Sequence, residues 1–175
     1  GWQGYFPFAH LGGGNLIKEQ VWKYMQDICA LPCPKIFHNA QYDVGWLKAS
    51  GITVNGTIID TMVAGALIDE NRYSYALNSL SKDYLGELKA ETELIEAAQQ
   101  HGVDPKGEMW KLPAEHVGFY AEQDARLTYM LWQRFKSEIH NQNLETIWDL
   151  ESKLLPTLID MRMRGIRGDV EKTEC

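Results

Sequence analysis

Residues 35–69, KIFHNAQYDVGWLKASGITVNGTIIDTMVAGALID, decide the fold class because short apolar runs alternate there with helical patterns. The run KIFH is typical of a short buried strand, and the segment from Asn39 to Ala49 has helical spacing with Val44 on its inward face. Gly51 is a typical helix-stop residue. This part of the chain therefore predicts a strand followed directly by a helix.

The same order repeats immediately afterwards. Residues 52–59, ITVNGTII, hold an Asn-Gly turn and a short apolar strand. Asp60 can cap the helical segment that follows, TMVAGALID, because a carboxylate accepts hydrogen bonds from the free N–H groups of a first turn. Strand, helix, strand and helix in succession indicate an α/β fold with a central sheet flanked by helices.

The flanking segments add one strand-like run and several helices. Residues 4–8, GYFPF, are strand-like, and residues 15–30 show a helical pattern that Asn15 can cap. Further helices are expected over 75–86, over 91–100, from Pro113 to about residue 140, and over 144–164 with a break or bend near Pro156. The sequence therefore predicts a helical second half behind the sheet.

The composition is that of one globular domain. Of 175 residues, 45% are apolar and 23% charged, and the net charge is −7. This acidic balance argues against a large basic footprint on duplex nucleic acid, but it permits an enzyme whose metal ions supply positive charge in a small site. No apolar run reaches the roughly 20 residues of a membrane span, and no signal peptide is visible. Cys29, Cys33 and Cys175 fit free thiols of a cytoplasmic protein.

The first candidate site segment is HNAQYDVGWL, residues 38–47. Asn39 and Asp43 directly follow a predicted strand, and ligands usually bind at the carboxyl ends of strands in open α/β sheets. Alternatively, Asn39 caps the following helix and Asp43 interacts favourably with the dipole of its first turn. Trp46, one turn after Asp43, could lie in the core or line the pocket at the strand end, and the core interpretation is favoured.

The second candidate segment is FYAEQDARLTYML, residues 119–131. Tyr120 and Asp124 are four residues apart and share one face of the long predicted helix. The neighbouring residues are largely apolar, and an aspartate beside a packed face is costly to bury unless it is paired or bound to a metal. The alternative is a simple Tyr–Asp hydrogen bond on a half-exposed face.

Together the two segments resemble the second and third exonuclease motifs of the proofreading domain of family A DNA polymerases, the family of bacterial DNA polymerase I and its phage relatives. Asn39, Tyr42 and Asp43 match the second motif, in which an aromatic residue and Asp follow Asn. Tyr120 and Asp124 match the third motif, Tyr-x-x-x-Asp. The resemblance implies a ribonuclease H-like exonuclease fold.

This resemblance extends over nearly the whole chain. Residues 56–69 and 75–86 come in the family's order, and Phe119, which stands where related enzymes have His, indicates the tyrosine subclass. Residues 151–169 resemble the segment that leads into the polymerase domain. We therefore expect an exonuclease domain over residues 1–143 and a helical lead-in to a polymerase domain over residues 144–175.

The resemblance also implies a mechanism, the removal of nucleotides from a DNA 3′ end by two-metal hydrolysis. Two divalent ions, Mg²⁺ or Mn²⁺, would lie about 4 Å apart and be held by oxygen ligands. By the family's pattern Asp124 binds one ion directly, and Asp43 binds the second largely through water. Tyr120 orients the attacking water. Asn39 supports the site or contacts the terminal nucleotide. Tyr42 is a candidate for stacking on the bases of a frayed 3′ end.

One part of the family pattern is absent. The first motif, Asp-x-Glu on the first strand, has no counterpart, since no Asp or Glu precedes Glu19. We therefore expect an N-terminally truncated sheet, metal ions that bind weakly or not at all, and little or no exonuclease activity of this chain. A missing strand would also expose a sheet edge that a second copy can pair with, which predicts a dimer.

Three other functions stay open from the sequence. The chain could bind single-stranded DNA ends without cutting them, act as a scaffold for a polymerase, or belong to a stand-alone exonuclease that trims RNA. Asp43, Tyr120 and Asp124 favour the exonuclease, and residues 151–169 favour a polymerase context. The expected location is the cytoplasm of a bacterial or phage-infected cell.

Overall fold

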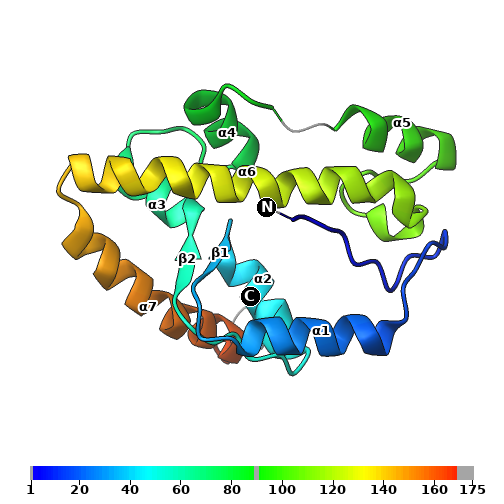
Figure 1. The fold of residues 1–175 in the computed structure, drawn as a ribbon, viewed down its shortest axis with the longest axis horizontal. Coiled ribbons are helices and arrows are strands. Elements are labelled where there is room, and N and C mark those ends of the chain that lie inside the picture. The colour runs from blue at the N-terminus through cyan, green and yellow to red at the C-terminus, as the bar shows by residue number, and fades with distance from the viewer. Residues whose placement is uncertain (1, 89–90, 169–175) are drawn as a thin grey trace.

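The structure is a computed structural model that describes residues 2–88 and 91–168. Helices predominate, and the two assigned strands lie early in the chain (Figure 1). The elements in chain order are α1 (Lys18–Ala30), β1 (Lys35–Phe37), α2 (Ala40–Ala49), β2 (Ile58–Asp60), α3 (Thr61–Ile68), α4 (Leu77–Leu85), α5 (Thr92–His101), the 3₁₀ turn η1 (Met109–Lys111), α6 (Ala114–Asn141) and α7 (Glu145–Arg164).

The sheet consists of β1 and β2, which are parallel, with Ile36 opposite Ile59. Both strands were predicted, and the α/β class is confirmed in this coarse form: a small parallel sheet in a mostly helical molecule. The strand expected over residues 4–8 is wrong, because this segment has no ladder partner within the described residues. Instead Tyr5 packs beside Gly118 on α6, and Pro7 lacks the N–H that a ladder needs.

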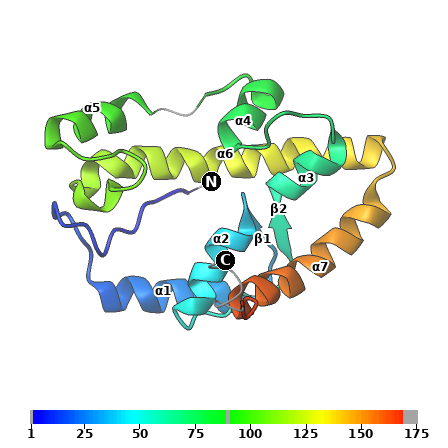
Figure 2. The same cartoon turned by 180° about the vertical axis from the view of Figure 1, so that it is seen from behind.

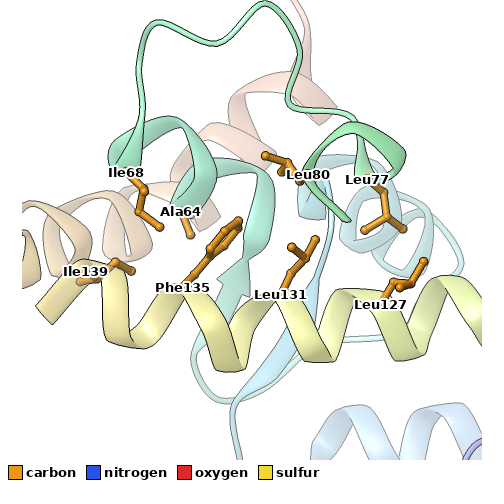
Figure 3. Packing of buried hydrophobic residues seen from close by; sticks show 8 residues of the cluster. All are labelled: Ala64, Ile68, Leu77, Leu80, Leu127, Leu131, Phe135 and Ile139. Atoms are coloured by element: carbon orange, nitrogen blue, oxygen red, sulfur yellow. The ribbon is translucent and has the colours of Figure 1, made fainter. Parts of the chain in front are cut away.

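The long helix α6 runs through the centre of the molecule, and other elements lie on both sides of it (Figure 1). The helices α4 and α5 lie along one side of it, and the sheet, α1 and α2 lie on the other, as both views show (Figures 1 and 2). Towards its C-terminal end α6 packs against α3 and α4 through one apolar cluster (Figure 3). This cluster contains Ala64, Ile68, Leu77, Leu80, Leu127, Leu131, Phe135 and Ile139. Its burial fixes the rotation of α6, and therefore the direction in which Asp124 faces.

The helix α7 returns beneath the sheet. Leu155 and Ile159 of α7 pack against Val44 of α2 and Ile58 of β2. Of the break or bend expected near Pro156, the break is wrong, because α7 runs continuously through this residue, whereas the bend stays a prediction. A proline removes one backbone hydrogen bond from a helix, but the buried residues on either side of Pro156 hold the two halves of α7 against the same cluster.

The predicted N-cap of α1 is also wrong. The helix begins at Lys18, whereas the side chain of Asn15 closes the preceding loop by accepting from the N–H of His10 at 2.8 Å and donating to its carbonyl at 2.7 Å. Cys29 and Cys33 are free thiols, as predicted, and Cys175 lies outside the described residues. In the part of the chain that the structure describes, no helix is both long and apolar enough to cross a membrane.

Candidate active site

A pocket of about 550 Å³ opens at the carboxyl end of β1. It brings together Asn39, Tyr42 and Asp43 from the start of α2 and Asp124 from the middle of α6. The first candidate segment therefore lies at the carboxyl end of a strand, as predicted, and four of the five predicted site residues line one cavity. The other lining residues are Ile36, Phe37, His38, Met62, Ala76, Leu77, Ala125 and Thr128.

A buried carboxylate behind the pocket sets the geometry of the turn between β1 and α2. Asp60 is 3% exposed and ends β2. Its Oδ1 atom accepts from the backbone N–H groups of Asn39 at 3.0 Å and Met62 at 2.9 Å, and its Oδ2 accepts from that of Ala40 at 2.8 Å. Asp60 therefore caps α3, as predicted, and also caps α2, which was not predicted.

This double cap determines the conformation of Asn39. Its backbone is left-handed, with φ of 66°, a conformation that asparagine adopts more readily than most residues. Its side chain makes no capping hydrogen bond to α2. The alternative in which Asn39 caps this helix is therefore wrong, since the carboxylate of Asp60 does so from the next strand and leaves Asn39 to line the pocket.

His38 is a pocket residue that the sequence analysis did not select. The hydroxyl of Thr61 donates to the carbonyl of Phe37 at 3.1 Å and lies 2.8 Å from Nδ1 of His38. Because the single hydroxyl proton goes to Phe37, Nδ1 of His38 must be the donor to Thr61. A neutral His38 ring then carries its lone pair on Nε2, which is buried in the pocket wall.

The third-motif residues lie on α6 in different surroundings. Asp124 lines the pocket, and its Oδ1 atom is buried. Tyr120 does not line the pocket and packs beside a third apolar cluster, formed by Leu94, Ala98, Leu112 and Val117. The helical spacing of Tyr120 and Asp124 is confirmed, but only Asp124 reaches the cavity in this structure.

The pocket is acidic. Burial, and secondly the negative charge of Asp60, raise the pKa of Asp43 to about 6 from its ordinary 3.8. Among the residues that the structure describes, no lysine or arginine lines this pocket. A phosphate group entering this pocket would therefore be repelled unless cations accompanied it.

Comparison with known proteins identifies the family. Residues 15–140 match the family model described as 3′-5′ exonuclease. The chain belongs to the 3′-5′ exonuclease family of DNA polymerase A. The resemblance seen in the sequence is thereby confirmed, and the pocket described above is the candidate active site of an exonuclease domain.

The relatives of this exonuclease domain are named as DNA polymerases. It is 37% identical to a DNA-directed DNA polymerase of Pseudomonas phage M6, over 98% of this chain and 26% of the relative. It is 33% identical to DNA polymerase DpoZ of Acinetobacter phage SH-Ab 15497, over 87% of this chain and 24% of the relative. It is 30% identical to DNA polymerase I of Chloroflexus aurantiacus, over 95% of this chain and 18% of the relative. The chain thus spans about a quarter or less of the length of these relatives.

Exonuclease domains of this family depend on metal ions, and the oxygen donors of the pocket suit such ions. Asp43 and Asp124 are hard ligands of the kind that Mg²⁺ and Mn²⁺ prefer. Within residues 2–88 and 91–168 no cluster of three or more His, Cys, Asp or Glu side chains forms a metal site. Mg²⁺ sites often use one or two carboxylates together with water and substrate phosphate, so the two carboxylates fit an ion that arrives with the substrate.

Trp46 departs from its predicted role. It was expected in the core, but it is 62% exposed and lies on the outer face of α2. The helical pattern does not distinguish a core tryptophan from one at the edge of a pocket, because both follow apolar neighbours at the same spacing.

The raised pKa of Asp43 gives a pH-dependent stability that can be measured without metal. Because the folded state favours protonated Asp43, its ionisation costs stability, and this cost develops as the pH rises from about 4 through about 6. We expect Asp43→Asn to raise the melting temperature at pH 8, with a difference that shrinks towards pH 4. Since Asp43 stays partly exposed, screening limits the gain to about 1 kcal/mol.

The measurement is thermal unfolding from pH 4 to pH 8 in EDTA, with Asp27→Asn as a control. Asp27 lies on the exposed surface of α1 and pairs only with Lys23 among the described residues. If the difference in melting temperature between wild type and Asp43→Asn were the same at every pH, the prediction would be contradicted.

Proposed function

We propose that this exonuclease domain removes nucleotides from the 3′ end of single-stranded DNA as the proofreading unit of a DNA polymerase. The observation that supports the proposal best is the meeting of Asp43 and Asp124 in one acidic pocket, although they come from separate helices. In this proposal the lead-in segment 144–175, which includes α7, connects the exonuclease domain to a polymerase domain. A dimer through an exposed sheet edge stays a prediction. The location of the domain in the cytoplasm of a bacterial or phage-infected cell also stays a prediction.

The proposed roles follow from where each side chain lies. Asp43 and Asp124 would hold two divalent ions, Mg²⁺ or Mn²⁺, and such ions when bound neutralise phosphate charge and activate water. Asn39 and Tyr42 would position the terminal nucleotide from the start of α2, because both line the same pocket. Tyr120 would orient the attacking water through its hydroxyl, after a rotation towards the pocket from its packed position one turn before Asp124.

Asp60 fixes the position of the site residues at the start of α2 relative to the sheet. Its three hydrogen bonds hold the end of β1 and the starts of α2 and α3 together, so Asn39 and Asp43 keep their positions relative to the sheet. Asp60 is thus a positioning residue in the proposed mechanism. Its carboxylate oxygens already accept hydrogen bonds from backbone N–H groups, and the residue is only 3% exposed.

The experiment is digestion of a 5′-labelled single-stranded DNA oligonucleotide by the 175-residue chain with Mn²⁺. We expect slow shortening in single-nucleotide steps from the 3′ end, and no shortening in EDTA. The reaction should be slow because two carboxylates, rather than a fuller set, line the described pocket. The 5′ label fixes the polarity, since degradation from the other end would release labelled mononucleotide at once.

Two other results would change the conclusion. Binding of the oligonucleotide without any Mn²⁺-dependent digestion would replace the proposal with the non-catalytic DNA-end-binding module considered from the sequence. If the chain neither bound nor digested the oligonucleotide, both functions would be overturned.

A further inference from the structure

A second pocket adjoins the candidate active site on α2. Its volume is about 370 Å³, and Tyr42 lines both pockets. The second pocket lies between the exposed side of α2 and the C-terminal end of α7. Its lining residues are Gln41, Tyr42, Gly45, Trp46, Ala49, Arg162 and Met163.

Two exposed aromatic rings form one wall of this second pocket. Tyr42 is 54% exposed and Trp46 is 62% exposed. Their ring centroids lie 6.4 Å apart at an interplanar angle of 69°, so the two rings offer differently oriented faces. Gly45 stands between them on the helix and faces Met163, and its lack of a side chain keeps the floor of the pocket open.

The charge of the second pocket is opposite to that of the first. Arg162 is its charged lining residue, and no carboxylate lines it in the described part of the chain. Arg164 and Arg167 are exposed close by in sequence at the same end of α7. In a chain with a net charge of −7, this concentration of arginine favours an anionic ligand.

We propose that the second pocket binds a nucleotide upstream of the 3′ end, with its base stacked on Trp46 and its phosphate beside Arg162. This inference rests on the proposed function, since it assigns the continuation of the strand whose end enters the first pocket. Tyr42 lines both pockets, so the pockets are adjacent along α2 and one strand can contact both. Aromatic stacking tolerates every base, and arginine contacts phosphate without reading sequence. A domain that receives mismatched ends of any sequence requires this kind of contact.

The test compares binding of the oligothymidylates dT2 and dT6 to the 175-residue chain in Ca²⁺, measured by fluorescence anisotropy of a 5′ label. The wild type should bind dT6 more tightly than dT2, because dT6 is long enough to occupy both pockets. In Trp46→Ala the affinity for dT6 should fall about tenfold, as expected for the loss of one stacked base. In Arg162→Gln the slope of log affinity for dT6 against log salt concentration should become less steep by roughly 0.7, the contribution of one phosphate contact on a single strand.

The matched control is Trp110→Ala. Trp110 is 49% exposed on η1 and lines neither pocket, so its removal should leave dT6 affinity at the wild-type level. Both tryptophans are at the surface, and circular dichroism checks that both variants stay folded. If affinity increased from dT2 to dT6 by the same factor in wild type and in Trp46→Ala, the inference would be overturned and the proposed function would stay intact. A wild type that binds neither oligonucleotide would overturn the proposed function itself, and this inference with it.

Discussion

Replacing Asp124 with alanine is expected to lower Mn²⁺-dependent digestion of single-stranded DNA by about a hundredfold to a thousandfold, the several kcal/mol that a metal-held phosphate contributes. Asp124 is the carboxylate that α6 contributes to the pocket, and its Oδ1 atom is buried there. Without it, Asp43 alone would face an incoming phosphate and metal. We therefore also expect weaker binding of Mn²⁺, measured by isothermal titration calorimetry in the presence of oligonucleotide.

The matched control for Asp124 is Glu122→Ala on the same helix. Glu122 lies two residues earlier and does not line the pocket. Its replacement should leave digestion and Mn²⁺ binding near wild type. Equal digestion by wild type and Asp124→Ala would show that the observed nuclease activity does not come from this pocket.

Replacing Asp60 with alanine is expected to destabilise the fold by about 3–5 kcal/mol, because three backbone N–H groups would lose a charged acceptor in a buried position. A loss of this size lowers the melting temperature by about 10 °C in a chain of this length. Asp60→Asn should lose less, because its remaining carbonyl oxygen still accepts from one or two of these groups.

Thermal unfolding at pH 7 measures both Asp60 variants, and Asp27→Ala is the control for the loss of an exposed aspartate on α1. Its ion pair with Lys23 is exposed and contributes little. If Asp60→Ala melted within about 2 °C of wild type, the double cap would not support the fold, and the positioning role given to Asp60 would be wrong.

The helices and strands were largely predictable because their signals are local. The short apolar runs before Asn39 and Asp60 became β1 and β2, and Gly86 ends α4 in a left-handed conformation as a helix-stop glycine does. The run GYFPF carries the same local signal as β1 but forms no strand. A strand requires a partner, and the sequence of one segment does not show which partner is available.

The candidate site was predictable in its residues but not in its construction. Asn39, Tyr42, Asp43 and Asp124 meet in one pocket, as the two motifs suggested. The second cap made by Asp60 depends on the parallel pairing of β1 with β2, which brings Asp60 opposite Phe37 beside the turn at Asn39. No spacing within either segment encodes that contact. The hydrogen bond between His38 and Thr61 depends on the same pairing.

The two apolar clusters along α6 have a consequence for motion. The helix has 28 residues and is about 42 Å long at 1.5 Å per residue. Tyr120 packs with the cluster that includes α5, whereas Leu127, one turn after Asp124, packs with the cluster formed by α3 and α4. Separate clusters often open as separate cooperative units. Amide hydrogen exchange in α5 can then rise without exchange in α3 or α4, and each such opening frees Tyr120 to turn while Asp124 keeps its place.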